Sequence, residues 1–237
     1  MKDIAVITPV PDVIECIIQN SILRKAIAKN VVNFHIINLR DFGKGSYRQI
    51  DDTPFGGGSG MVMMADPLFK AIDYALDLIG IDDNVRIVYP SPQGTTWNQR
   101  CAENLSKYEK IIMICGHYKG IDERVIEKYV TDEYSLGDFI MTSGEIPAMA
   151  MLDSVMRLIP GTLNTLESAL TDSFTQELLD YPHYSKPREI NEMSVPEVLF
   201  GGHHEKIASW RQNQKEIKTK QKRPDLWEKY NKMKESE

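Results

Sequence analysis

The chain has 237 residues, of which 42% are hydrophobic and 26% charged, and its formal net charge is −6. These ordinary globular values exclude a chain that is disordered throughout, and the length allows one large domain or an α/β domain with a smaller one. No apolar run approaches the ~18 residues of a membrane span and no signal-peptide pattern precedes the first strand. We therefore expect a soluble, cytoplasmic protein without a membrane partner.

Charge is distributed unevenly along the chain. Residues 1–180 carry 16 Lys and Arg against 25 Asp and Glu, whereas residues 181–237 carry 12 against 9. Residues 206–223 include seven basic side chains and one acid. A basic segment on an acidic protein indicates a polyanionic partner, although charge alone favours the simpler interpretation of a solvated helix face.

Apolar strands alternate with helices through the first two thirds of the chain. The predicted strands are residues 4–8, 31–37, 85–89 and 111–115, with a further strand after residue 124. The predicted helices are residues 12–22, 66–79, 97–105 and 145–159, with one more beginning at 122–124. Nearly continuous apolar strands in this order favour a mostly parallel sheet that is covered by helices on both faces.

Three loops follow strands of this predicted sheet. They are residues 89–94, 116–120 and 135–144, the last containing a short strand. The carboxyl ends of parallel strands form the edge where such sheets bind ligands. These loops are rich in Gly, Ser and Pro and poor in Lys and Arg, which favours a neutral or cationic adenine-containing ligand over a triphosphate.

A glycine-rich loop precedes the third strand. Residues 54–61 contain four glycines within five positions, so the backbone can approach a ligand closely and expose its N–H groups. The spacing matches neither GxGxxG nor a P-loop, and a mobile hinge is an equally good interpretation.

The last third of the chain has a different character. Residues 161–188 are rich in Thr, Ser, Asn, Pro and aromatic residues, which is typical of a linker or a functional loop. An extended piece is expected at 195–202. A helix over 203–219 should turn Ile207, Trp210 and Ile217 inward, and a final helix is predicted near 224–234.

The motifs exclude several kinds of catalytic site. No Cys/His cluster has zinc spacing, and neither HExxH nor a GxSxG elbow is present, so the sequence predicts no metal site and no serine-hydrolase triad. The three cysteines are expected to be reduced packing residues. Asp138 is typical of a turn, and Asp122 and Glu123 are typical of first-turn helix acids.

Three longer stretches resemble a known family. They are ICGHYKGIDER at residues 114–124, SLGDFIMTSGEIPAM at 135–149 and YPHYSKPR at 181–188. Further matches are residues 55–61, SPQG at 91–94, RLIPG at 157–161, and His204, Ile207, Trp210 and Arg211. In these motifs, which keep the same order and cover nearly the whole chain, the sequence resembles the bacterial tRNA (guanine-N1)-methyltransferases of the TrmD family.

The resemblance implies a homodimeric enzyme of the knotted SPOUT class with its active site at the subunit interface. Such an enzyme transfers the methyl group of S-adenosylmethionine to N1 of the guanosine just 3′ of the tRNA anticodon. The implied fold is an α/β parallel sheet with helices on both faces and a C-terminal trefoil knot, plus a small, mostly helical C-terminal domain. The implied boundaries are a knotted cofactor-binding domain at 1–160, an interdomain linker and active-site loop at 161–185, and a helical tRNA-binding domain at 186–237.

The same resemblance assigns roles to individual residues. Those implied to hold the cofactor are Tyr89, Pro90, Gly116, Leu136, Gly137, Asp138, Phe139, Ile140, Met141, Gly144 and Pro147. Those implied to contact tRNA are Gly57, Gly58, Lys206, Arg211 and Lys215. Asp172 matches the proposed general base of the family, and Arg157 matches its partner at the guanine.

The chemistry explains why an aspartate and an arginine are needed. Guanine N1 carries a proton and is not nucleophilic until a base within hydrogen-bond reach removes it. Charge then builds on O6, where a fixed guanidinium stabilises it. Without the family match, Asp172 would be an ordinary linker aspartate and Arg157 a charge at a helix C-terminus. A base on a mobile linker allows the site to be completed only when tRNA orders that segment.

Some positions depart from the commoner family pattern. Lys119 stands where glutamate is frequent, Ser143 replaces a glycine and Ser59 a proline, and residues 8–11 are unusual for the end of the first strand. These departures bear on cofactor affinity more than on reaction type.

Two other functions stay open. The first is a knotted methyltransferase that acts on another RNA site or on a ribose 2′-hydroxyl; Asp172 discriminates it, because a ring N–H requires a base. The second is a non-catalytic RNA-binding relative, which calorimetry with S-adenosylmethionine discriminates.

Overall fold

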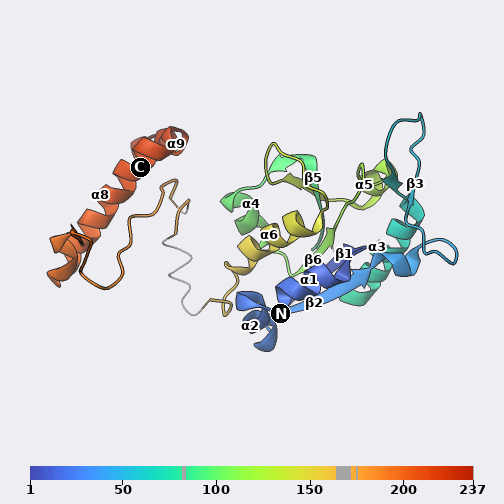
Figure 1. Ribbon diagram of the computed structural model, residues 1–237, viewed down its shortest axis with the longest axis horizontal. Coiled ribbons are helices and arrows are strands. Elements are labelled where there is room, and N and C mark those ends of the chain that lie inside the picture. The colour runs from blue at the N-terminus through green and yellow to red at the C-terminus, as the bar shows by residue number, and fades with distance from the viewer. Residues whose placement is uncertain (82–83, 164–171, 175, 237) are drawn as a thin grey trace. The chain divides into compact units, whose positions relative to one another are not determined.

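The computed structural model describes residues 1–81, 84–163, 172–174 and 176–236 (Figure 1). The chain separates into two compact units, Met1–Leu166 and Glu167–Glu237, and each is described by itself. Among the described residues, no helix is both long and apolar enough to cross a membrane.

The first unit is built on a five-stranded sheet in the order β2-β1-β6-β5-β7, in which every neighbouring pair is parallel. The strands are β1 (Lys2–Thr8), β2 (Val32–Asn38), β5 (Val85–Thr96), β6 (Lys110–Ile114) and β7 (Asp132–Ser135). The predicted parallel α/β sheet is therefore confirmed.

Two hydrophobic cores cover the two faces of this sheet. Successive residues of a strand point to opposite faces, and in β6 Ile111 and Met113 join one core while Ile112 and Ile114 join the other. The first core includes residues of α1 (Pro11–Ile18), α2 (Ser21–Ala28), α4 (Gln99–Leu105) and α6 (Glu145–Met156). The second includes residues of η1 (Leu39–Phe42), α3 (Ala65–Ile79) and α5 (Glu123–Tyr129). Burial on both faces is why these strands read as continuous apolar runs.

The helix expected over residues 12–22 is two helices, so this prediction was wrong. Asn20 has extended backbone (φ −121°, ψ 162°), and its side-chain amide donates a hydrogen bond of 2.5 Å to the Cys16 carbonyl at the end of α1. Asparagine readily competes with helical hydrogen bonding in this way. Ser21, at φ 54°, then redirects the chain into α2.

The loop expected at residues 89–94 is part of β5, which continues to Thr96. Pro90 and Thr95 both pair with Tyr134, so the residues between them form an irregular bulge in the strand. A prolyl nitrogen cannot donate to a ladder, which is why the Pro-Ser-Pro sequence read as a loop. The short strand expected within 135–144 is also absent, because β7 ends at Ser135 and residues 136–144 form no strand.

A small antiparallel pair frames the glycine-rich loop. It consists of β3 (Asp51–Asp52) and β4 (Val62–Met63), which the sequence did not reveal because two residues show no periodicity. Gly56, Gly57 and Gly58 all have positive φ, and a Cβ added at any of them would meet no atom within 4 Å. The loop tip is therefore open, and its backbone adopts conformations that favour glycine.

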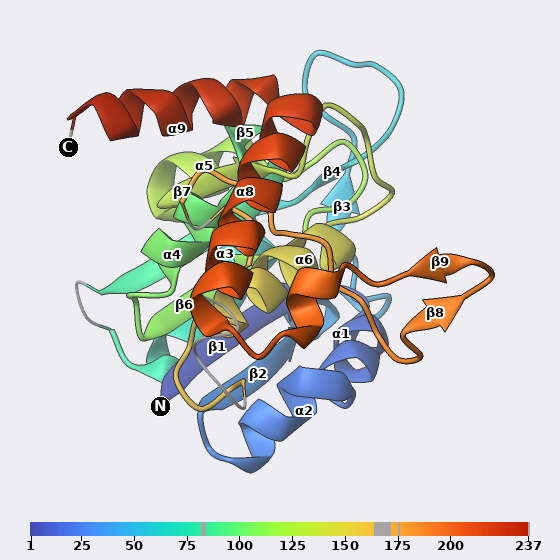
Figure 2. The same cartoon turned by 90° about the vertical axis from the view of Figure 1, so that its left-hand side faces the viewer.

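The second unit is mainly helical, with α8 (His204–Lys222) and α9 (Pro224–Ser236). Figure 2 shows its hairpin of β8 (Glu189–Ile190) and β9 (Met193–Ser194), which the sequence analysis missed. Asn191 and Glu192 occupy the two-residue turn at φ 47° and 63°, as tight hairpin turns require.

Two local predictions in this unit were wrong. The piece expected to be extended at 195–202 contains a 3-10 helix, η2 (Glu197–Phe200), which begins directly after Pro196. Ile217, expected to face inward, is 42% exposed. In this part of α8, the neighbouring residues Thr219 and Glu216 face the rest of the unit instead. The Thr219 hydroxyl accepts a hydrogen bond from Leu179 N–H, and the Glu216 carboxylate accepts one from the hydroxyl of Tyr230 on α9.

Candidate functional site

A cavity of about 610 Å³ opens at the carboxyl ends of β5, β6 and β7 in the first unit. Its walls come mainly from residues 89–93, 116–121 and 134–144. The first segment is the irregular part of β5, the second follows β6, and the third contains the end of β7. This is the edge at which parallel α/β sheets bind their ligands.

The predicted cofactor residues gather at this cavity. Ten of the eleven line it, and Asp138 does not. Lys119 and Ser143, the departures from the family pattern in these loops, also line it. The structure thus brings the three sequence segments together, while the role of each residue toward a cofactor stays a prediction.

Two glycines allow the three segments to approach one another. Gly144 N–H donates a hydrogen bond of 2.8 Å to the Gly116 carbonyl. A Cβ on Gly144 would lie 2.6 Å from the Gly116 nitrogen, and one on Gly116 would lie 2.8 Å from Cε2 of Tyr89. A larger residue at 144 would force two backbone segments apart, and one at 116 would displace the Tyr89 ring, so close packing requires these glycines.

The turn at residues 116–121 is hydrogen-bonded to residues 61–63, which include β4. Lys119 N–H donates to the Met61 carbonyl, and Met63 N–H donates to the Gly120 carbonyl, both at 3.0 Å. Tyr118 at φ 60° and Gly120 at φ 123° produce the sharp reversal. The segment after the glycine-rich loop therefore supports one wall of the cavity.

A buried carboxylate lies beneath the cavity. Glu145, 1% exposed in the first turn of α6, accepts a 2.6 Å hydrogen bond from the Thr8 hydroxyl. Its two oxygens lie 2.9 and 3.0 Å from Nε2 of His117, which lines the cavity. Burial by itself would raise the pKa of this carboxyl, but hydrogen bonds from His117, Thr8 and Ser143 together hold the pKa below its ordinary value.

This network joins the end of β1, the 116–121 turn and the start of α6. It could not be predicted from the sequence, because Thr8 lies more than 100 residues before both His117 and Glu145 and each of the three residues has an ordinary local role. The available signal was an acid at the start of an otherwise apolar helix, immediately after a glycine.

The lining of the cavity is largely neutral. Among the described lining residues, Lys119 and Glu123 carry charge at neutral pH besides the titratable His117. Burial raises the pKa of Tyr89 to about 12, with only partial compensation by a hydrogen bond to the Ile121 backbone, so its phenol stays protonated. Such a lining suits a ligand that is not strongly anionic.

Apolar side chains at the cavity are exposed. Phe139, Ile140 and Met141 are 56%, 81% and 37% exposed, and Ile146 on α6 is 48% exposed. Three consecutive exposed apolar residues, as at 139–141, are typical of a surface that another molecule covers.

The predicted catalytic pair falls on different units. Arg157 is the C-cap residue of α6 and is partly buried, whereas Asp172 belongs to the second unit and is exposed. Residues 164–171, which lie between them, are outside the described residues. Their relation is therefore untested, and both roles stay predictions.

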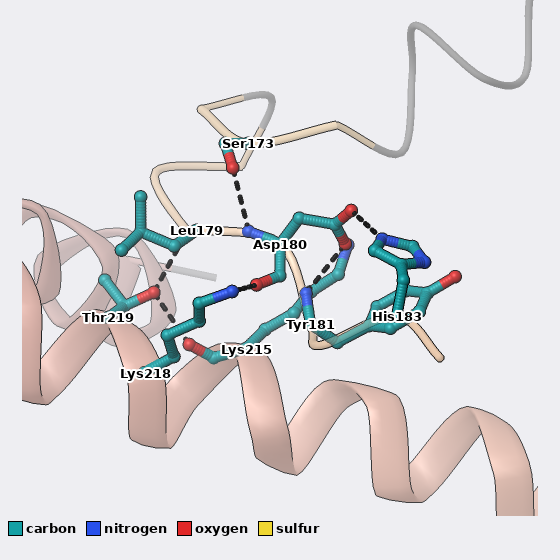
Figure 3. A network of polar contacts seen from close by, with 8 residues as sticks. All are labelled: Ser173, Leu179, Asp180, Tyr181, His183, Lys215, Lys218 and Thr219. Atoms are coloured by element: carbon teal, nitrogen blue, oxygen red, sulfur yellow. Dashed lines mark hydrogen bonds and ion pairs between the residues drawn. The ribbon is translucent and has the colours of Figure 1, made fainter. Parts of the chain in front are cut away.

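The segment that follows Asp172 is anchored to α8, as Figure 3 shows. Asp180 N–H donates to the Ser173 hydroxyl at 2.9 Å, and the Asp180 carbonyl accepts from the Lys218 ammonium at 3.1 Å. Leu179 N–H donates to the Thr219 hydroxyl at 2.8 Å. Part of the predicted 161–185 linker is thus hydrogen-bonded to the helical unit.

The predicted tRNA contacts differ in their availability. Lys206 and Arg211 are exposed on α8, and the backbone of Gly57 and Gly58 is open in the first unit. The Lys215 ammonium lies 3.7 Å from the Asp180 carboxylate, and only 19% of its side chain is exposed. It is therefore less accessible to a phosphate than the other two cations.

Comparison with known proteins places the chain in a family. The model of the family described as tRNA (guanine-1)-methyltransferase TrmD matches residues 1–229. A tRNA (guanine-N(1)-)-methyltransferase of Clostridioides difficile is 43% identical over 226 residues, which are 95% of this chain and 97% of that protein. Proteins of the same name from Brevibacillus brevis and Caldanaerobacter subterraneus are each 46% identical over 226 residues, covering 95% of this chain and 91% and 92% of theirs. The chain belongs to the tRNA (guanine-1)-methyltransferase TrmD family.

Proposed function

We propose that this protein transfers a methyl group from S-adenosylmethionine to N1 of the guanosine just 3′ of the tRNA anticodon. Methylation of tRNA guanine at N1 follows from the family, whose model spans nearly the whole chain. The observation that supports a methyl donor site most strongly is the neutral cavity at the carboxyl ends of β5, β6 and β7. We place the activity in the cytoplasm, with tRNA as the partner.

S-adenosylmethionine fits the residues that line the cavity. Its volume of about 610 Å³ lies within the range of small-molecule sites. The backbone of 136–141 and of Gly116 would hold the adenosine and amino acid parts, and Tyr89 and Pro147 would flank them. When bound, this group supplies a methyl on a sulfonium, which is a good leaving group. A positively charged sulfonium is compatible with a lining that has no cluster of cations among its described residues.

The acid–base chemistry belongs to residues outside the cavity lining. We propose that Asp172 accepts the proton of guanine N1 as the nitrogen attacks the methyl carbon. Arg157 donates to O6, where negative charge develops as the N1 proton leaves. Positioning of the guanine against the methyl group of S-adenosylmethionine supplies most of the remaining acceleration. The proposed domain roles are then as follows. Residues 1–160 hold S-adenosylmethionine, residues 161–185 carry the general base Asp172, and residues 186–237 bind tRNA.

We further propose the trefoil knot and the homodimer. The order of β1, β6 and β5 in the sheet, and the packing of Gly144 on the Gly116 and Cys115 backbone, are compatible with a chain that threads through its own loops. Phe139, Ile140 and Met141, which line the cavity and are exposed, favour a second subunit as their cover.

The experiment that tests this function uses labelled S-adenosylmethionine and unmodified tRNA. The substrate carries guanosine at the position 3′ of the anticodon, and digestion to nucleosides maps the product. We expect 1-methylguanosine at that position alone. A different methylated nucleoside, a ribose 2′-O-methyl product, or donor binding without any transfer would refute the proposal.

A further inference from the structure

The second unit contains a groove of its own, with a volume of about 860 Å³. It lies between residues 181–188, the η2 region and one face of α8, and we call it the C-terminal groove. Its walls are mainly aromatic and apolar, with Tyr184, Phe200, Ile207 and Trp210 among the lining residues. The function proposed above gives this unit tRNA binding, with Arg211 among the predicted contacts, but it does not say which part of tRNA the groove would take.

The charges along the C-terminal groove are all of one sign. Lys186, Arg188 and Arg211 line it, and none of its lining residues is an aspartate or a glutamate. An apolar groove whose charged lining residues are all cations complements a ligand that joins flat apolar groups to negative charges. Nucleic acid has this composition, because each base is attached to a phosphodiester.

The groove presents flat surfaces suited to bases. The Arg188 guanidinium lies 4.1 Å from the Phe200 ring centroid, and the Arg211 guanidinium lies 4.7 Å from that of Tyr181. Tyr184 and Phe200 remain 49% and 45% exposed despite being large and apolar. Aromatic rings and guanidinium planes are the surfaces on which proteins stack unpaired bases.

The Asp180 network holds one wall of the groove in place. The Asp180 carboxylate accepts from Tyr181 N–H at 2.8 Å and lies 2.8 Å from Nε2 of His183 (Figure 3). The Tyr181 and His183 rings then pack with centroids 4.6 Å apart. Through the Lys218 contact with the Asp180 carbonyl, this wall is fixed to α8 before any ligand binds. A preformed site loses less conformational entropy on binding.

We propose that the C-terminal groove binds unpaired bases of tRNA, stacked on Tyr184 and Phe200, with Lys186 and Arg188 on the adjoining phosphates. The proposal rests on the function inferred above, since tRNA is the substrate. Paired bases of an A-form helix cannot enter such a groove, because their faces are covered by their neighbours. The loops of tRNA are therefore the part of the substrate that fits it.

The first test uses the unaltered full-length protein. tRNA with 4-thiouridine at single loop positions is irradiated in the complex, and the crosslinked peptides are identified by mass spectrometry. We expect crosslinks from at least one loop position to peptides that contain Tyr184, Phe200 or Trp210. Crosslinks confined to the first unit, or to α9, would overturn the proposal.

The second test compares variants by filter binding of tRNA at fixed salt. Tyr184→Ala and Phe200→Ala should each raise Kd about tenfold and leave the salt dependence unchanged, because stacking is lost and no phosphate contact is. Tyr184→Trp should restore binding. Met193→Ala, which removes a side chain that is 66% exposed on β9 outside the groove, should bind tRNA like the unaltered protein.

The outcomes separate this proposal from the proposed function. If the protein forms 1-methylguanosine but the two alanine variants keep the unaltered Kd, the groove proposal fails and the function stands. If the groove crosslinks to tRNA and no 1-methylguanosine forms, the function fails instead. Should Tyr184→Ala change the molar mass in solution without changing Kd, the groove is a contact between copies of the chain, and the proposal is overturned. If a variant proves to be unfolded by circular dichroism, the crosslinks decide alone.

Discussion

The two compact units of this chain are stabilised by different interactions, and the difference bears on what each can bind. In the first, both faces of a parallel sheet are buried, and the loops at its edge are locked by glycine packing and by the Glu145 network. In the second, the buried apolar residues of the described part are Leu178, Leu226 and Tyr230. There, residues 176–188 are held by hydrogen bonds at Asp180 and by cation–π pairs.

A two-faced core can hold loop backbones at fixed positions, and this suits a small ligand that must be oriented for reaction. A thin helical unit with exposed rings and cations suits a long, flexible, charged ligand instead. Under the proposed function, the first unit holds the methyl donor and the second makes much of the tRNA contact. The following predictions test that division, from the largest expected effect to the smallest.

Removal of the Arg157 guanidinium should affect the reaction and not donor binding. Arg157→Gln is expected to lower kcat by about 10²- to 10³-fold, because the guanidinium hydrogen bond to the charge that develops on guanine O6 is lost. Arg157→Lys, which keeps the charge without the planar fork, should lose less. Single-turnover methyl transfer and calorimetry with S-adenosylmethionine measure the two quantities. Equal losses in donor affinity and in kcat would place Arg157 at the donor site instead.

Gly144→Ala should damage the cavity itself. The added methyl would lie 2.6 Å from the Gly116 nitrogen, so we expect a loss of about 1–3 kcal/mol in the free energy of unfolding and a marked loss of donor binding. Gly57→Ala is the matched control: its φ of +78° costs about 1–2 kcal/mol of strain, yet no atom lies within 4 Å of the new methyl. The control should therefore keep donor affinity. Urea unfolding and calorimetry on both variants check this prediction.

Glu145→Gln should show how much the buried network stabilises the first unit. Because the folded-state pKa of Glu145 lies below its ordinary value of 4.5, its contribution is present above about that pH and is lost as pH falls through the lower folded pKa. We expect the variant to lose about 1–3 kcal/mol at pH 7 and progressively less toward pH 3.

The control for this prediction is Glu127→Gln, on an exposed position of α5, which should stay within about 0.5 kcal/mol of the parent at every pH. Urea unfolding at a series of pH values gives both curves. A gap between Glu145→Gln and parent that is constant with pH would mean that the carboxylate charge contributes nothing.

The smallest expected effects concern single cations of α8. Lys206→Ala should weaken tRNA binding about equally for different tRNAs and reduce the slope of log K against log salt by about 0.9. Lys215→Ala should change that slope less, because its ammonium already lies near the Asp180 carboxylate. Binding measured at several salt concentrations compares the two. A larger slope change for Lys215→Ala would show that the Asp180 pair opens for tRNA.

Prediction from the sequence succeeded where burial leaves a clear hydrophobic pattern in a strand or helix. Both faces of β1 and β6 are covered, so their apolar runs could be recognised, and α3 was predicted to within one residue at its start. It failed where two residues make a strand, as in β3 and β8, and where Asn20 interrupts a helix whose apolar spacing continues.

The candidate site divides in the same way. The loops at 116–120 and 135–144 were predicted from pattern alone, whereas 89–94 is an irregular part of β5, and the cavity lies among these three segments. The Thr8–His117–Glu145 network could not be predicted, because it depends on three distant segments meeting. Asp172 and Arg157 were assigned through the family resemblance alone, since neither residue type is unusual at its position.

The central claim is that the first unit holds the methyl donor while Asp172 of the second unit activates guanine N1. It is tested most directly by measuring single-turnover methyl transfer and S-adenosylmethionine affinity on one preparation of Asp172→Asn. We predict that transfer to guanine N1 falls by about 10²- to 10⁴-fold while donor affinity stays within about twofold. Near-normal transfer, or a loss of donor binding as large as the loss of transfer, would contradict this account.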